Sequence, residues 1–210
     1  DFKSLKENDF LIPIGLGLKG MSLFEKLKNS FSSWSEIETN EVNCFWAGRE
    51  LDETRSNEWL SDTEGTTKFI KGRMIQRYTI VEEPRLFVNK ENWIPPKSVN
   101  YERIVWRDVS RTNQKRRIVA TIIPKNVVAG NSLGVCYFND SNTKSLYFLL
   151  GIFNSFCFEF QLRSYLATGH VSLSSLRKVS MPNRAEYNKH QLLSQLVETV
   201  LEGNIENENK

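Results

Sequence analysis

Apolar and polar residues alternate with a period of two in several short segments, the pattern of half-buried β-strands. Val42, Cys44 and Trp46 fall on one face of the first such segment. Further strands are predicted at Lys68–Ile70, Ile75–Val81, Arg85–Val88, Leu133–Phe138 and Lys178–Met181. Glycine and proline lie between several of these runs, as expected for turns.

Two β-rich runs, Arg103–Val109 and Arg117–Ile123, are separated by the polar segment Ser110–Arg116. This arrangement predicts a hairpin with a long polar loop. One face of this hairpin is expected to carry Ile104, Trp106, Ile118, Ala120 and Ile122.

Helical periodicity is found in three places. Ser22 and Glu25 have the spacing of a capping box, which predicts the start of a helix that ends near Ser32–Ser33. Ser145–Leu166 reads as one long apolar helix, with its phenylalanines in the core: Phe148, Phe153, Phe156, Phe158 and Phe160. A C-terminal helix is predicted from the stripe Leu192, Leu193, Leu196, Val197, Val200 and Leu201.

Together these elements predict an α+β fold, with mixed, mostly antiparallel sheets of short strands, a long buried helix and a C-terminal helix. The chain has 210 residues, of which 40% are hydrophobic, so it can bury a core and is not disordered throughout. No apolar run reaches the roughly 18 residues that would span a bilayer, so no membrane partner is expected. The first residue is Asp1, and we expect a piece of a longer protein.

Cysteine and histidine usage excludes several kinds of site. Cys44, Cys136 and Cys157 are widely spaced and form no C-x-x-C pair, so neither a disulfide framework nor a zinc site is expected. This usage fits a cytoplasmic protein. His170 and His190 are the only histidines, and no nucleophile–base pair is apparent. No metal site and no catalytic residue are predicted.

Charge is distributed unevenly. The formal net charge is +3, but the segment between Arg103 and Arg184 contains twelve Lys/Arg against three acidic residues. The remainder of the chain is acidic. A basic half beside an acidic half suggests a polyanionic partner, and the alternative is a solvated surface with uneven charge.

Gly15–Gly20 matches the dinucleotide-binding pattern G-x-G-x-x-G and precedes a predicted helix. Pro13 interrupts the apolar stretch before it, and no parallel βαβ unit follows. A flexible linker is therefore favoured, with a dinucleotide-binding enzyme fragment as the alternative.

The loop Ser110–Arg116 contains the residue types that read DNA bases. Arg111 suits guanine, whereas Asn113 and Gln114 suit adenine. Lys115 and Arg116 could hold phosphates and fix the register. An ordinary solvated hairpin tip is the alternative.

Lys71-Gly72-Arg73, with Arg77 nearby, places cations around a glycine that would let a phosphate approach the backbone. The alternative is a turn glycine with exposed cations. His170, in a polar loop, is expected to have a structural role rather than to contact DNA.

Five segments in order resemble the TaqI-like C-terminal specificity domain of adenine-specific DNA methyltransferases, especially those of type IIS and fused restriction–modification enzymes. The segments are Met21–Leu27 (MSLFEKL), Gly48–Leu51 (GREL), Phe69–Tyr78 (FIKGRMIQRY), the hairpin Arg103–Pro124, and Leu149–Ser155 (LLGIFNS) with Val179–Pro182 (VSMP). They span about Met21 to Pro182, most of the chain.

The resemblance implies a domain organisation. Residues 1–40 would be a linker and lead-in helix from a missing catalytic domain, residues 41–182 the target-recognition domain, and residues 183–210 a C-terminal helix with a frayed tail. The family's catalytic half binds S-adenosylmethionine and carries an Asn/Asp-Pro-Pro-Tyr/Phe motif. The only Pro-Pro here, Pro95-Pro96, lacks the flanking residues of that motif, so no catalytic residue is carried over.

The function implied is sequence-specific recognition of double-stranded DNA, without catalysis or a cofactor of its own. The parent protein would be a site-specific adenine methyltransferase, with or without restriction endonuclease activity. The candidate DNA-binding residues are Lys71, Arg73, Arg77, Arg107, Arg111, Asn113, Gln114, Lys115, Arg116, Arg117, Arg177 and Lys178. A subunit-docking scaffold, using the C-terminal helix, is a further alternative.

Overall fold

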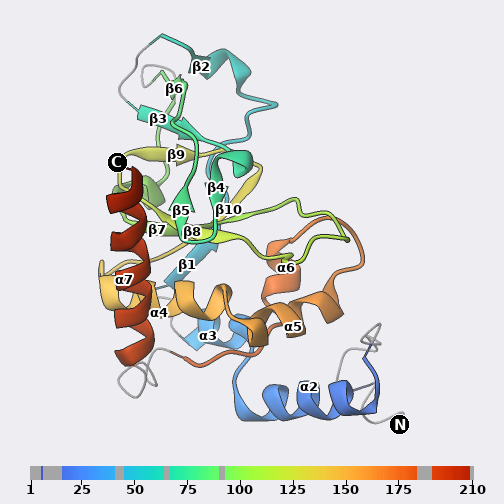
Figure 1. The fold of residues 1–210 in the computed structure, drawn as a ribbon. Coiled ribbons are helices and arrows are strands. Elements are labelled where there is room, and N and C mark those ends of the chain that lie inside the picture. Colours follow the sequence, from blue (N-terminus) through green and yellow to red (C-terminus); the bar gives the residue numbers. More distant parts are fainter. Residues whose placement is uncertain are drawn as a thin grey trace.

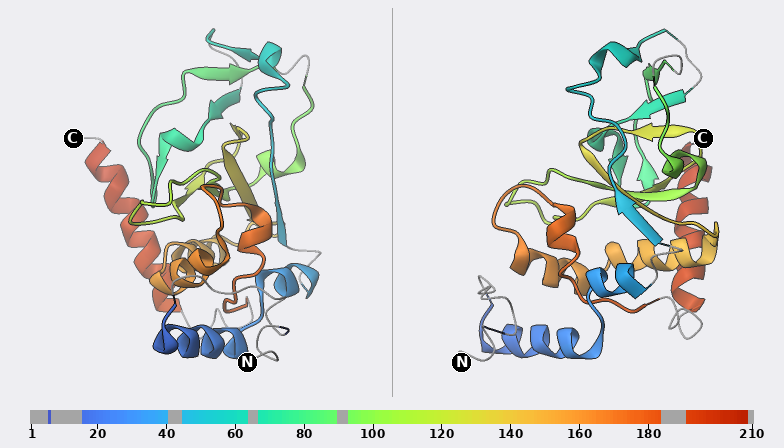
Figure 2. Two further views of the ribbon diagram at one scale, coloured as in Figure 1. Left: turned by 90° about the vertical axis from the view of Figure 1, so that its right-hand side faces the viewer. Right: turned by 180° about the vertical axis from the view of Figure 1, so that it is seen from behind.

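The computed structural model describes residue 6 and residues 16–40, 45–63, 67–89, 93–183 and 191–208. Helices and mostly antiparallel short strands pack together, so the predicted α+β class is confirmed (Figure 1). A central sheet lies between a helical layer and a second, smaller sheet, as the turned views also show (Figure 2).

The central sheet has the order β1 (Phe45–Gly48), β10 (Leu133–Phe138), β7 (Arg103–Arg107), β8 (Ala120–Ile123), and all its pairs are antiparallel. The predicted hairpin is confirmed as β7 and β8, in which Ile104 pairs with Ile122 and Trp106 with Ala120.

Each face of the central sheet is covered by a different layer. Ile104, Trp106 and Cys136 pack against helices on one face, whereas Val105 and Val135 pack toward the second sheet on the other. Alternate residues of one strand point to opposite faces, so both sets are buried and the strands read as nearly continuous apolar runs.

The second sheet has the order β2 (Leu60–Ser61), β6 (Leu86–Val88), β3 (Thr67–Ile70), β9 (Val127–Ala129), with β3 and β9 parallel. Short 3₁₀ turns occur at Asn57–Trp59, Gly72–Met74 and Lys97–Asn100.

The predicted strand Ile75–Val81 is wrong, because the chain folds back within it. β4 (Ile75–Gln76) and β5 (Thr79–Ile80) form a two-stranded hairpin. Tyr78 in the turn has a φ of 67°, a left-handed conformation that sequence patterning gives no reason to expect for tyrosine.

A buried ion pair connects the region after β1 to β7. Arg103 and Glu50 are 2.6 Å apart, and both side chains are inaccessible to solvent. Arg103 also donates to the carbonyls of Tyr101, Pro124 and Val127, while Glu50 accepts from the backbone N–H of Ala129. The pair therefore satisfies backbone groups at the junction of the two sheets.

The N-terminal helices differ in detail from the prediction. α2 (Leu18–Ser30) begins after Gly17, four residues before Ser22, so the predicted capping box is wrong. The reciprocal arrangement occurs instead at α3 (Trp34–Asn40), where Ser33 and Glu36 bond each other's backbone N–H groups. The predicted strand at Lys178–Met181 is reduced to an isolated bridge between Ser180 and Ser33.

The predicted helix Ser145–Leu166 is two helices, α4 (Thr143–Phe153) and α5 (Phe156–Tyr165), bent by 60°. Asn154 interrupts the helix because its side-chain amide bonds the backbone N–H and carbonyl of Ala120 on β8. Ser155 then caps α5 by accepting from the N–H of Phe158 at 3.1 Å. No single described helix is long and apolar enough to cross a membrane; α4 and α5 reach that length and composition only together, across the bend.

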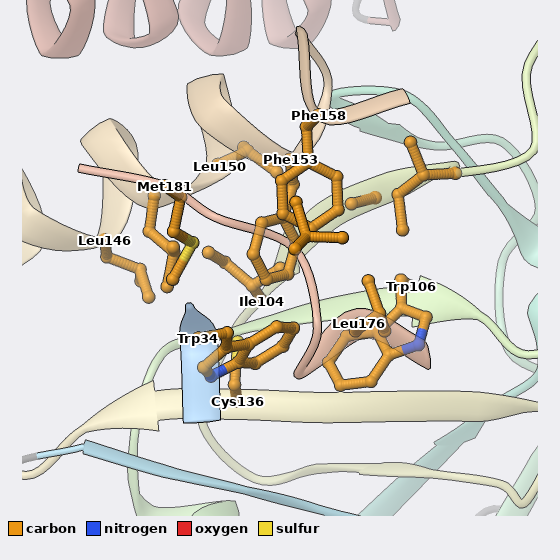
Figure 3. Packing of buried hydrophobic residues seen from close by; sticks show 14 of the residues in the cluster. Trp34, Ile104, Trp106, Cys136, Leu146, Leu150, Phe153, Phe158, Leu176 and Met181 are labelled. Carbon is orange, nitrogen blue, oxygen red and sulfur yellow. The ribbon is translucent and has the colours of Figure 1, made fainter. Parts of the chain in front are cut away.

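Aromatic residues fill the main core (Figure 3). The ring centroid of Trp34 lies 5.8 Å from that of Trp106, edge-on, and 5.0 Å from that of Phe153, so α3, β7 and α4 meet there. Gly134 on β10 makes room for Trp106, since a Cβ at this position would lie 2.1 Å from its ring.

The chain ends with α6 (Leu173–Leu176) and α7 (Gln191–Glu208), and α7 packs along α4. The apolar stripe of α7 is split. Val197 is buried and Leu193 and Leu201 pack against the core, whereas Leu192, Leu196 and Val200 are exposed.

Candidate nucleic-acid interface

The polar loop between β7 and β8 is anchored from within by a carboxylate of α5. Glu159 is 5% exposed, and its two oxygens accept from the backbone N–H of Arg117 at 2.8 and 3.0 Å. One of them also accepts from the N–H of Ile118 at 3.1 Å. A buried carboxylate with this many donors holds the backbone of the loop in one conformation.

The tip of the loop is anchored by Arg163, one helical turn after Glu159. Its Nε donates to Glu159 at 2.6 Å, and its Nη2 donates to the carbonyls of Gln114 and Lys115 at 2.7 and 3.0 Å. Ser110 adds a hydrogen bond to the side chain of Gln114 at 2.7 Å. These hydrogen bonds therefore fix the tip of the loop to α5, which distinguishes it from an ordinary solvated hairpin tip.

Four side chains of this loop are exposed, those of Arg111, Thr112, Asn113 and Lys115. Arg77, in the turn between β4 and β5, is also exposed. None of the cations Arg77, Arg111 and Lys115 forms an ion pair with any residue that the structure describes. Their charges are thus available to a partner.

Arg116 lies between this loop and the start of α5. Its Nη2 donates to the carbonyl of Asn154 at 2.6 Å, and its guanidinium stacks over the ring of Phe156 at 4.1 Å from the centroid. Burial lowers the pKa of Arg116, and the neighbouring Arg77 lowers it further. Like charges are therefore held close together here, which an anion would relieve.

Other predicted contacts lie inside the protein. Arg117 is 4% exposed and donates to the carbonyl of Thr168 at 2.5 Å, and burial lowers its pKa. Arg107 is half-buried and donates to the carbonyl of Ile75. Burial lowers the pKa of Arg107 as well. Arg117 was predicted to bind DNA, but it is a structural residue, because its buried side chain bonds the backbone of Thr168.

Three more of the predicted cations are paired with carboxylates. Lys71 lies 2.6 Å from Glu53, and Arg73 lies 3.1 Å from Glu82. Arg177 makes two hydrogen bonds to Glu38, at 2.5 and 3.1 Å, and these raise its pKa. Lys178, the next residue, is exposed.

The twelve candidate residues therefore do not form one surface. Arg77 and Arg163 both lie near Arg116, and Arg163 bonds the tip of the loop, whereas Arg177 and Lys178 follow α6 and adjoin α3. Gln114 is half-buried and bonded to Ser110, which reduces its availability for base contacts.

Two residues near this surface differ from the sequence-based prediction. Arg163 is not among the predicted site residues, although its spacing of four from Glu159 is a helical ion-pair signal. Phe156 was expected in the core but is 80% exposed. In a continuous helix it would share a face with the buried Phe153, and the break at Asn154 turns it outward.

Asp108, at the start of the loop, contacts both Arg49 and His170. Its buried carboxylate accepts from Arg49 at 2.7 Å and lies 3.3 Å from Nδ1 of His170. The backbone N–H of Val171 donates to the carbonyl of Asp108. His170 therefore helps hold the segment after α5 against β7.

The residues that the structure describes contain no group of three or more His, Cys, Asp or Glu placed to hold a metal ion. Gly17 is the residue before α2 in the glycine-rich motif. Gly15 and the apolar stretch before it lie outside the described residues.

No protein-family model matches the sequence, and neither does any curated protein. One solved structure, described as "Structural basis underlying complex assembly and conformational transition of the type I R-M system", aligns with 99% of this chain at 13% identity. The alignment covers 49% of that chain, so this chain spans about half its length. The TM-score of the superposition is 0.46.

Proposed function

We propose that this chain is the double-stranded DNA recognition module of an adenine-specific (N6) DNA methyltransferase of a restriction–modification system. The observation that carries the proposal is the anchored β7–β8 loop, in which Arg111, Asn113 and Lys115 are exposed and Arg116 lies near the exposed Arg77. A fixed backbone with exposed cations and an exposed amide suits a partner that offers both phosphates and base edges.

The ordered resemblance of five segments to methyltransferase specificity domains supports the choice of enzyme class. In this proposal catalysis, S-adenosylmethionine binding and the target adenine belong to a covalently linked methyltransferase domain. The protein would act in the cytoplasm. This module would contribute binding energy and sequence preference while the linked domain extrudes the target base.

Within the loop, the roles divide by residue type. Arg111 and Asn113 would read base edges, because each can form two hydrogen bonds to a single base. Lys115 and Arg77 would neutralise phosphates and set the register. Glu159 and Arg163 would contribute indirectly, by keeping the loop in its binding conformation.

Fluorescence anisotropy with a labelled duplex at several salt concentrations tests the proposal. Contacts to about five phosphates predict that log K falls with log salt at a slope of about −4.5. Replacing both Arg77 and Lys115 by Gln should reduce the steepness by about 2.

Lys68→Gln is the matched control, since Lys68 is exposed but pairs with Glu83 on the second sheet. This variant should leave the slope unchanged. Affinity that does not depend on salt, or equal effects of the control and the double variant, would refute DNA binding by this surface.

A further inference from the structure

Phe156 is an exposed aromatic residue beside the proposed DNA-binding loop. It is the first residue of α5, and 80% of its surface is accessible, whereas Phe153 and Phe158 on either side of it are buried. Exposing a phenylalanine to water is unfavourable, since its full burial would gain about 1.5–3 kcal/mol. Nothing in the packing of the core requires this residue to be aromatic.

The ring is nevertheless held in a defined position. The guanidinium of Arg116 stacks on it, and the same side chain donates to the carbonyl of Asn154, two residues before it. Asn154 is in turn bonded to Ala120 of the central sheet, and Ser155 caps the helix. The ring is thus oriented without being buried, so less side-chain entropy would be lost when it contacts a partner.

The arginine stacked on the ring has further cations near it. Arg77 and Arg163 both lie close enough to Arg116 to lower its pKa, and Glu159 is the nearby carboxylate that opposes them. Glu159 is already committed to two backbone N–H groups and Arg163. An exposed apolar ring that carries an arginine on one face, close to the cations of the loop, has the chemistry of a base-stacking group beside phosphate contacts.

We propose that Phe156 enters the base stack of bound DNA as an apolar wedge, held by Arg116, while Arg77 and Lys115 bind the phosphates. The inference rests on the proposed function, because it requires that the surface bind duplex DNA. Phenylalanine is one of the residues that DNA-binding proteins insert between base steps, at the cost of partial unstacking. The exposed part of the ring would gain in the complex the burial it lacks in the free protein.

A duplex with a central abasic site tests the wedge without knowledge of the recognised sequence. Its stack is already interrupted, so the protein need not separate two bases there. Wild-type protein should bind this duplex more tightly than the intact one, by on the order of 100-fold, because the unstacking cost of a few kcal/mol per base step is avoided. A 2-aminopurine beside the abasic site should change its fluorescence when the ring stacks on it.

Phe156→Ala should abolish both the preference and the fluorescence change while retaining the salt dependence, because the phosphate contacts remain. Phe156→Leu, which keeps an apolar group, should retain part of the preference. Leu192→Ala is the matched control, since this apolar residue on α7 is 66% exposed. It should behave as wild type, and the melting temperatures of all variants should agree.

Two different failures are distinguishable. If the wild-type protein binds neither duplex in a salt-dependent manner, the proposed function fails and the wedge fails with it. If both duplexes bind with the expected salt dependence but equally tightly, or if Phe156→Ala keeps the preference, the wedge is wrong and the DNA interface stands.

Discussion

The carboxylate of Glu159 accepts two hydrogen bonds from the backbone N–H of Arg117, although 41 residues lie between them in the chain. This contact joins α5 to the end of the β7–β8 loop that leads into β8. Because this contact fixes the backbone of Arg117, the side chain of Arg117 points inward and bonds Thr168. The side chain of its neighbour Arg116 instead stacks on Phe156 at the surface of α5. Two adjacent arginines therefore have different roles.

Replacing Glu159 by Gln tests this anchor. The amide has one acceptor oxygen, and its NH2 group faces backbone donors, so we expect a loss of about 1–3 kcal/mol in the free energy of unfolding. The amide protons of Arg117 and Ile118 should also exchange faster. Urea unfolding and hydrogen exchange measure the two effects.

Glu198→Gln on the exposed side of α7 is the control for that change and should alter neither quantity. Unchanged protection of the Arg117 and Ile118 amides in Glu159→Gln would show that the loop is held by other contacts.

The Arg103–Glu50 pair should be essential for stability, because removing one partner leaves a buried charge without compensation. Arg103→Met is expected to cost about 3–5 kcal/mol, measured by chemical denaturation. Arg73→Met breaks the exposed pair with Glu82 and should cost about 1 kcal/mol or less. Similar costs for the two variants would contradict the structural role given to the buried pair.

Base reading and phosphate binding in the loop should separate on mutation. Asn113→Ala is expected to cost about 1–3 kcal/mol at one position of the preferred site and little elsewhere. Lys115→Gln should weaken binding to all sequences about equally and reduce the salt slope by about 1. Selection from a random duplex library, followed by titration of single-base variants, measures both.

A uniform loss across sequences in Asn113→Ala would place this residue on the backbone of the DNA instead. Both side chains are exposed, so neither substitution should lower the melting temperature.

Stability should fall at alkaline pH because of Cys136. Burial raises the pKa of this thiol well above its ordinary value. Its contribution is therefore complete below the unfolded-state pKa of about 8.5 and is lost as pH rises toward the folded-state pKa. We expect the free energy of unfolding to fall by up to about 1.4 kcal/mol per pH unit there.

Cys136→Ala should flatten this pH dependence between pH 8.5 and 9.5, below the range in which tyrosines titrate. With Cys44 replaced by Ser, a thiol reagent at pH 8 should label the exposed Cys157 of the native protein and leave Cys136 unmodified. Rapid labelling of Cys136 would show that the central sheet opens more readily than its packing indicates.

Several elements of the fold were predictable because their causes are local. Runs of β-favouring residues bounded by polar segments identified β10 and the β7–β8 hairpin, and the period of two predicted the face on which Ile104, Trp106 and Ala120 meet. The break between α4 and α5 was missed because Asn154 is unremarkable within an apolar helix. Its side chain interrupts the helix only because the backbone of Ala120 lies within reach.

The α+β class and the concentration of cations in the second half follow from residue types and their spacing, so both were predictable. Tertiary structure alone decided which cations face solvent. Long cationic side chains reach carboxylates and carbonyls far away in the chain: Arg177 bonds Glu38, 139 residues distant, and Arg117 bonds Thr168. Such contacts determine whether a cationic side chain is bonded within the protein or exposed to a partner, and local sequence does not encode them.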